Sequence, residues 1–176
     1  MALASVQDVL SFWFDELTPQ QWFNTSAEVD EAIATRFAQT HDAASRGELF
    51  DWRETPDGRL AEIIVLDQFS RNLFRNDPRS FATDTLALVL AQEAIAAGDD
   101  QRINPDRLAF LYMPFMHAES LAMHEIQSAT EEKESKFGNT LRPANIRIHG
   151  TMYRRIFTAA DITPIRFLVV DPQERS

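Results

Sequence analysis

The side chains best suited to acid–base chemistry fall in two short stretches of the sequence. Residues 66–75 read Leu-Asp-Gln-Phe-Ser-Arg-Asn-Leu-Phe-Arg and combine a carboxylate, two amides and two guanidinium groups. Residues 113–125 read Met-Pro-Phe-Met-His-Ala-Glu-Ser-Leu-Ala-Met-His-Glu and hold two histidines. Carboxylates and imidazoles transfer protons near neutral pH, and arginine binds carboxylate or phosphate groups. A functional site would therefore be built from these two stretches.

The first stretch belongs to a predicted helix, residues 59–74, whose apolar residues point nearly all round its axis. A helix of that kind is central and buried. At about 100° per residue, Asp67 and Arg71 fall in the same sector as apolar residues, and Gln68 and Arg75 border that sector. Charged groups thus lie on a face that should exclude water.

A buried charge costs several kcal/mol unless it is paired, so each of these groups needs a partner. In one interpretation the role is structural: Asp67 and Arg71, at i and i+4, pair with each other or hold neighbouring loops. In the other, the helix lines a cleft whose missing partner is a ligand. The residues of that cleft would be Asp67, Gln68, Arg71, Asn72 and Arg75.

The arginines of this region suggest the charge of such a ligand. Arg59, Arg71, Arg75 and Arg79 would make the cleft positive within an acidic protein, which favours an anionic ligand. Trp52 is most simply part of the core or of the cleft wall, with a contact to the ligand as the alternative.

The second stretch lies on a further predicted helix. His117 and His124 are seven residues apart, about 10 Å along the axis, which is too far for both to bind one metal ion directly. We therefore expect no metal site. His117 is interpreted either as a core residue among methionines or as a general base paired with Asp67, with Glu119 nearby on the helix.

Composition limits the classes of function. The chain has 176 residues, a formal net charge of −10 and no cysteine. We expect a cytoplasmic protein without cysteine-bound metal, because no export signal or membrane-spanning run is present. The negative charge disfavours nucleic acid and membrane surfaces as partners. No phosphate-binding loop, dinucleotide fingerprint or nucleophile elbow occurs, and we expect no cofactor.

Apolar periodicity and capping residues predict an all-α fold of antiparallel helix hairpins, either a bundle or a tetratricopeptide-like stack. The predicted helices run from Ser5 to Pro19, from Ser26 to Gly47, over 59–74, over 84–97, and from Asn104 to about Thr130 with a kink at Pro114. Residues 50–58 are expected to form a loop. Period-two alternation occurs only at residues 162–170.

Several of these segments together resemble a bacterial family known as domain of unknown function 924. The resemblance covers roughly residues 6–128. It is carried by residues 9–14, 22–23, 36–37, 52, 55–56, 58–60, 66–75, 81–84 and 110–119. It implies an all-helical, tetratricopeptide-like fold, and it assigns no activity and no catalytic residue.

The C-terminal end departs from this resemblance. We expect residues 1–150 to form the all-helical domain and residues 151–176 to be a divergent tail, either frameshifted or disordered. A shift of one base over residues 167–173 would permit the Leu-Gly-Arg and Ser-Thr sequence typical of the family.

Three functions remain open on the sequence. The first is a cleft that binds a small anionic ligand, with Asp67 and His117 as the candidates for hydrolytic or other acid–base catalysis. Ligand binding is favoured over catalysis here, because the sequence contains no nucleophile motif, cofactor motif or metal-ligand spacing. The second is a non-catalytic, tetratricopeptide-like module that binds an acidic peptide. The third is a purely structural role for the buried polar residues. The sequence does not fix the ligand or the oligomeric state.

Overall fold

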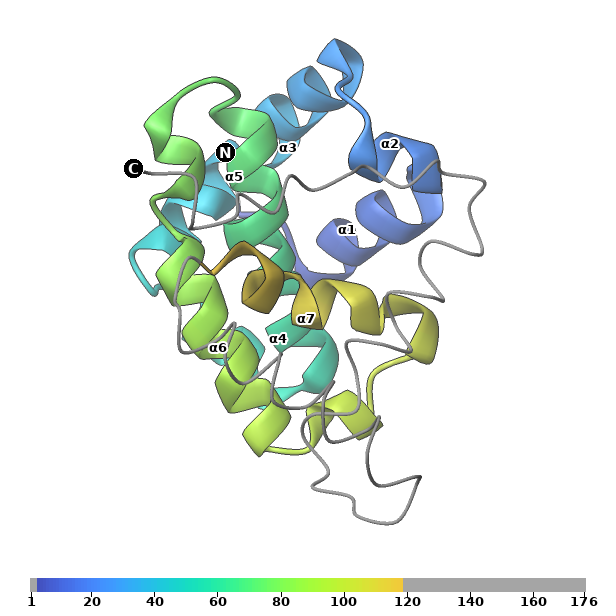
Figure 1. Cartoon of the computed structure of the whole chain (residues 1–176), viewed down its shortest axis with the longest axis vertical. Coiled ribbons are helices and arrows are strands. Elements are labelled where there is room, and N and C mark those ends of the chain that lie inside the picture. The colour runs from blue at the N-terminus through green and yellow to red at the C-terminus, as the bar shows by residue number, and fades with distance from the viewer. Residues whose placement is uncertain (1–2, 119–176) are drawn as a thin grey trace, which may run out of the picture.

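The computed structural model describes residues 3–118, and this part of the chain is all-α, as predicted, with no strand (Figure 1). Its α-helices are α1 (Val6–Ser11), α2 (Pro19–Phe23), α3 (Ala27–Ser45), α4 (Pro56–Ile64), α5 (Ser70–Leu73), α6 (Asp84–Ala96) and α7 (Leu108–His117). Two π-helical segments, η1 (Phe12–Glu16) and η3 (Val65–Phe69), continue α1 and join α4 to α5. Short 3-10 helices are η2 (Phe50–Glu54), η4 (Pro78–Phe81), η5 (Asp99–Gln101) and η6 (Pro105–Arg107).

None of the helices described is long and apolar enough to cross a membrane. The tetratricopeptide-like arrangement stays a prediction. The proposed boundary at residue 150 and the tail 151–176 lie outside the described residues.

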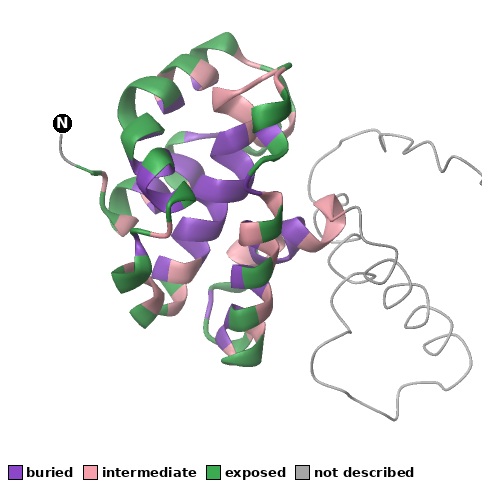
Figure 2. Cartoon of the chain, turned by 90° about the vertical axis from the view of Figure 1, so that its left-hand side faces the viewer, coloured by how far each residue is buried: buried purple, intermediate pink, exposed green. Residues whose placement is uncertain are grey.

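A central rod formed by α4, η3 and α5 runs through the molecule. Every residue from 60 to 70 is buried, which confirms the expectation from the apolar pattern (Figure 2). The rod is surrounded because α4 packs against α1, α6 and α7, while η3 and α5 pack against α3. Charged side chains on this rod therefore have to be paired within the protein or at its edge.

The rod begins earlier than predicted. Thr55 caps α4 by accepting a hydrogen bond from the Gly58 backbone N–H at 3.1 Å, and Pro56 occupies the first helical position. Gly58 is required because a Cβ there would lie 1.9 Å from the Trp52 carbonyl oxygen. The expected loop 50–58 is thus the 3-10 helix η2 followed by the first turn of α4.

The surrounding helices start and stop where the sequence signals them. Ser5 forms a capping box with Asp8, and the side chain of Ser26 caps α3. Gly47 and Gly98 follow α3 and α6 with φ of +72° and +77°, the left-handed conformation that glycine adopts without strain. The pair Trp22-Phe23, expected in a connection, instead lies in α2, which Thr18 and Gln21 cap.

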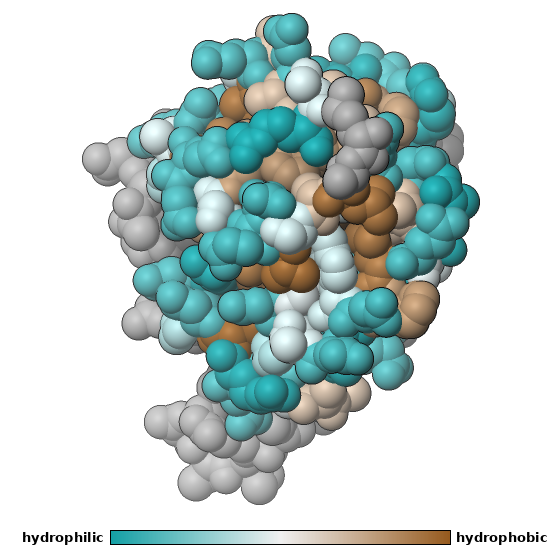
Figure 3. Space-filling model, turned by 180° about the vertical axis from the view of Figure 1, so that it is seen from behind, coloured by the Kyte–Doolittle hydropathy of each residue, from teal (hydrophilic) through white to brown (hydrophobic). Residues whose placement is uncertain are grey.

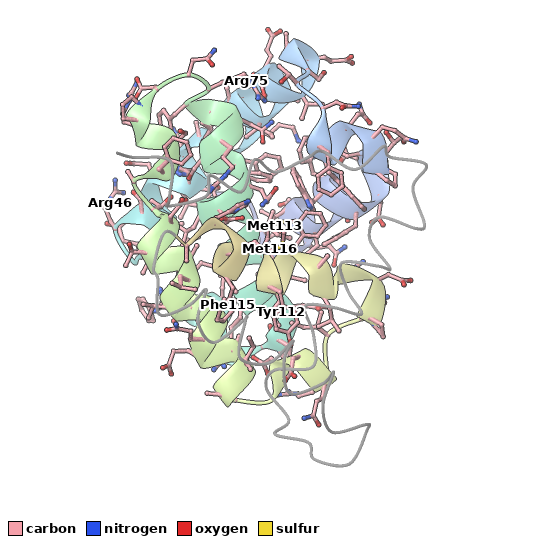
Figure 4. All side chains as sticks on the ribbon, viewed as in Figure 1. Arg46, Arg75, Tyr112, Met113, Phe115 and Met116 are labelled. Atoms are coloured by element: carbon pink, nitrogen blue, oxygen red, sulfur yellow. The ribbon has the colours of Figure 1, made fainter. Side chains whose placement is uncertain are left out.

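The helix α7 is shorter than predicted. Asn104 caps the 3-10 turn that leads into it, Pro114 lies inside it, and Ala118 has extended backbone after His117. The remainder of the expected helix, to Thr130, lies outside the described residues. Met113 and Met116 share one side of α7, and Tyr112 and Phe115 lie along the other (Figure 4).

The face of the molecule opposite to the view of Figure 1 is mostly covered by hydrophilic side chains, with hydrophobic patches between them (Figure 3). The exposed large apolar residues of the described chain are few. They are Leu3, Phe50, Phe81 and Val89.

The rod also carries a buried ion pair that the sequence analysis did not anticipate. Glu62 is 0% exposed and receives two hydrogen bonds of 2.7 Å from the guanidinium of Arg53. The hydrogen bonding to Glu62 raises the pKa of Arg53 above its ordinary value. Arg59 in turn donates to the Arg53 carbonyl oxygen at 2.8 Å, so η2 is fixed against the rod through charged groups.

Arg53→Met should lower the free energy of unfolding by about 3 kcal/mol, because it leaves the Glu62 carboxylate buried without a partner. The double variant Arg53→Met with Glu62→Leu should recover part of that loss. Arg46→Met, which breaks only exposed contacts with Asp42 and Glu48, serves as the control and should change stability little. Urea unfolding measures all three, and equal losses for Arg46→Met and Arg53→Met would contradict the expectation.

His41 provides a second, pH-dependent test of the core. Its side chain is buried and its Nε2 lies 2.6 Å from Ser70 Oγ. Burial lowers the pKa of His41, although Asp42 acts in the opposite direction. The unfolded chain therefore binds a proton at His41 more readily than the folded protein does.

Stability should thus fall as the pH is lowered through the ordinary histidine pKa of about 6.5, since the unfolded state takes up more protons in that range. His41→Gln should reduce this loss when the free energy of unfolding is compared at about pH 8 and about pH 5.5. A pH dependence of the same size in the variant would show that His41 is not responsible.

Candidate functional site

The candidate site is built on the π-helical turn η3, which carries Asp67 and Gln68 in the middle of the rod. A π-turn shifts the backbone hydrogen bonds and leaves carbonyl groups for other donors. The Leu66 carbonyl oxygen accepts from Ser70 Oγ and from Thr83 Oγ1, each at 2.6 Å. The Asp67 carbonyl oxygen accepts from Arg71 NH1 at 2.6 Å. Side chains therefore stabilise a turn that a regular helix would not contain.

Asp67 and His117 contact each other across two helices. The Asp67 side chain is 1% exposed, and its Oδ1 lies 2.8 Å from His117 Nδ1. The His117 side chain is 27% exposed. Gln68 donates a short hydrogen bond to the other oxygen, Oδ2. The carboxylate thus has protein partners on both oxygens, while the imidazole reaches the surface.

Arg71 meets the same carboxylate from the other side. Its NH1 lies 3.3 Å from Asp67 Oδ1, as the i, i+4 spacing predicts. Asp84, at the start of α6, accepts from both NH1 and NH2 at 3.0 Å. Among the described residues no acceptor takes the Nε hydrogen of Arg71 or the second hydrogen of NH2. Within residues 3–118 these two donors have no partner, and the side chain that carries them is 23% exposed.

This geometry determines which nitrogen of the His117 imidazole carries the hydrogen. An ionised carboxylate accepts hydrogen bonds only, so Nδ1 of His117 donates to Asp67. The neutral imidazole then carries its lone pair on Nε2, the nitrogen away from Asp67. A buried carboxylate that fixes the tautomer and leaves Nε2 available is the arrangement of a histidine general base.

Asn72 and Arg75, predicted for the same cleft, lie against α3 instead. Asp30 accepts from Asn72 at 2.8 Å and from Arg75 Nε and NH2 at 2.6 and 2.7 Å. Burial would raise the pKa of Asp30, but the hydrogen bonds from Arg75 and Asn72 outweigh it and the pKa lies below its ordinary value. Figure 4 shows Arg75 at the end of the rod beside α3. These residues hold the rod to α3.

The other arginines expected to make the cleft positive are also paired. Arg59 donates to Asp99 at 3.1 Å, and Arg79 donates to Asp77 at 2.9 Å. Trp52 packs against Gly58, which is nine residues before Asp67 or about 13 Å along the rod. The structure therefore brings together four of the predicted residues, and it places Asn72, Arg75 and Trp52 elsewhere. The four are Asp67, Gln68, Arg71 and His117.

Glu119 and His124 lie outside the described residues, so the predicted position of Glu119 near His117 stays a prediction. Within residues 3–118, no group of three histidines or carboxylates is placed to hold a metal ion.

Comparison with known proteins places the chain in a family. The model of the family described as "Bacterial protein of unknown function (DUF924)" matches residues 9–156. The chain belongs to this family. The match extends past residue 128, where the resemblance seen in the sequence ends, and it includes both stretches that form the site. No curated protein matches the chain.

Among solved structures, the chain is similar to the protein of unknown function ATU0120 from Agrobacterium tumefaciens. It is 39% identical to this chain, with a TM-score of 0.66, over 74% of this chain and 72% of the other. The similarity to this solved structure supports the fold, and neither comparison assigns a function to the site.

Two residues of the site escaped the sequence analysis. Thr83 and Asp84 were not among the predicted site residues, although Thr83 donates its hydroxyl hydrogen to the Leu66 carbonyl and Asp84 accepts from Arg71. The signal available was the Thr-Asp pair at the start of a helix that follows the arginine-rich stretch. Their contacts with η3 and α5 come from the packing of α6 and could not be derived from spacing.

The tautomer of His117 is a direct test of this geometry. Nitrogen NMR of the imidazole should show the hydrogen on Nδ1 at a pH where the ring is neutral, because Asp67 accepts it. Asp67→Asn should produce a mixture of tautomers, since an amide can donate as well as accept. A neutral His117 with its hydrogen on Nε2 in the unmodified protein would contradict the assignment.

Proposed function

We propose that this protein is an acid–base enzyme, most simply a hydrolase, that acts on a small molecule at the Asp67–His117 pair. The observation that carries the proposal is the 2.8 Å contact between His117 Nδ1 and the buried Asp67 carboxylate, with the imidazole partly exposed. A carboxylate that served stability alone would already be satisfied by Gln68 and Arg71. Its additional use to orient a surface-reaching histidine favours a catalytic role.

The roles of the residues follow from their atoms. His117 Nε2 removes a proton from a water molecule as the water oxygen attacks the substrate, and Asp67 stabilises the imidazolium that forms. Arg71 donates its remaining N–H groups to the oxygen on which negative charge develops. His117 then returns the proton to the leaving group, so the enzyme ends in its starting state.

The ligand is proposed to present an anionic or carbonyl oxygen to Arg71. An anionic ligand was predicted from four arginines, and three of these are now paired away from His117. Arg71 alone supports that prediction, and its charge is opposed by Asp67 and Asp84. The peptide-binding alternative gains no specific support from these contacts.

His117→Gln should reduce hydrolysis of an activated probe such as p-nitrophenyl acetate by about 100-fold or more in kcat/KM, because the general base is lost. Asp67→Asn should cause a comparable loss without removing the imidazole. Asp42→Asn, a change of the same type at an exposed aspartate, is the matched control and should leave the rate unchanged.

A second measurement does not depend on the choice of substrate. Diethyl pyrocarbonate attacks an accessible, unprotonated imidazole nitrogen, so it should modify His117 and spare the buried His41. Full hydrolytic activity in folded His117→Gln, or equal modification of the two histidines, would refute the proposed function.

A further inference from the structure

One exposed aromatic side chain lies at the edge of the proposed site. Phe81 is 63% exposed, although phenylalanine is among the residues most often buried. It ends the 3-10 helix η4, which is held in place by its own hydrogen bonds. Asp77 accepts from the Arg79 backbone N–H at 2.9 Å, and Ser80 Oγ donates to the Asp77 carbonyl at 2.7 Å. The ring is therefore presented by an ordered turn with its Ser80 neighbour buried.

The ring of Phe81 is positioned against the one arginine that the site uses. The guanidinium carbon of Arg71 lies 5.6 Å from the centre of the ring, within the range of a cation–π contact. Asp84 and the Asp67 carbonyl fix that guanidinium from two directions. The ring and the open donors of Arg71 thus lie side by side.

The same arginine connects this ring to the histidine. Arg71 NH1 and His117 Nδ1 both lie within 3.3 Å of one oxygen atom, Asp67 Oδ1. The guanidinium of Arg71 is thus the neighbour of both the imidazole, through Asp67, and the ring of Phe81. An aromatic group attached to the carbon that bears a ligand oxygen bound by Arg71 would reach the ring of Phe81.

A second exposed phenylalanine, Phe50, shows that exposure alone does not place a ring against an arginine. Phe50 is 64% exposed, yet among residues 3–118 no guanidinium lies over its ring. It lies in η2, beside the start of the rod and away from Asp67. Phe50 is therefore a matched control for Phe81.

We infer that the substrate class of the proposed site is an ester or amide of an aromatic carboxylic acid, with its carbonyl oxygen on Arg71 and its ring against Phe81. The aromatic carboxylate is the product of the reaction, and the same contacts bind it. The inference rests on the proposed function for the site, and it names the ligand class that this site takes. Contacts between two aromatic rings contribute roughly 0.5–1.5 kcal/mol beyond simple burial, which corresponds to about a two- to tenfold preference for an aromatic ligand. Phe81 is a specificity-determining residue in this assignment and takes no part in proton transfer.

The experiment compares two carboxylates of similar size and equal charge, benzoate and cyclohexanecarboxylate. Each is titrated into the full chain while the Nε–H resonance of Arg71 is followed by NMR. Both should shift that resonance, and benzoate should bind about two- to tenfold more tightly. Phe81→Leu, which keeps an apolar side chain and removes the ring, should abolish the preference while both ligands still bind. Phe50→Leu should retain the preference of the unmodified protein.

Equal affinities in the unmodified protein, a preference that survives Phe81→Leu, or no shift of Arg71 with either ligand would each overturn the inference. These outcomes are separate from the hydrolysis and modification tests of His117. If His117 proves to be the base and benzoate is not preferred, only the ligand class is wrong. If benzoate is preferred through Phe81 and His117→Gln keeps full activity, the site binds aromatic carboxylates without acid–base catalysis.

Discussion

The carboxylate of Asp67, placed in the middle of a buried helix, is the constraint on which the rest of the structure depends. Its side chain is 1% exposed, and a buried carboxylate is costly unless its oxygens are hydrogen-bonded. Gln68 supplies one partner from the next residue, Arg71 a second from the next turn, and His117 a third from α7. Pairing Asp67 thus requires α5 and α7 to lie at fixed distances from η3.

Through Arg71, the pairing of Asp67 also fixes the position of α6. The charge of Arg71 is shared between Asp67 and Asp84, and Asp84 is the first residue of α6. The preceding residue, Thr83, donates to the Leu66 carbonyl that the π-turn leaves open. Ser70 donates to the same oxygen and also contacts His41 of α3. The turn that presents Asp67 is therefore supported from α3, α5 and α6 at once, which is why an irregular helix segment is stable at this position.

The sequence predicted the helices well because their start and stop signals are local. Each signal acts within one helical turn, and the structure uses each as expected. The signals are Ser5, Ser26, Gly47 and Gly98. The buried rod was also predictable, since its apolar residues point in all directions. The start of α4 was misplaced because Pro56 and Gly58 are turn residues in most contexts. Here Thr55 caps the helix, and Gly58 lies in its first turn because a side chain there would clash with the Trp52 carbonyl.

The candidate site was predictable only as far as helical spacing reaches. The contact of Asp67 with Arg71 follows from their separation along one helix, and the contact with His117 was anticipated because both residues had to face the core. The other aspartate partners of the arginines were not anticipated, because Asp30, Asp84 and Asp99 come from other helices and turns. A count of arginines on the rod consequently overstated the positive charge available to a ligand. Ion pairs neutralise most of that charge. The donors that remain for a ligand are those of Arg71, which lies beside the histidine and the exposed ring of Phe81.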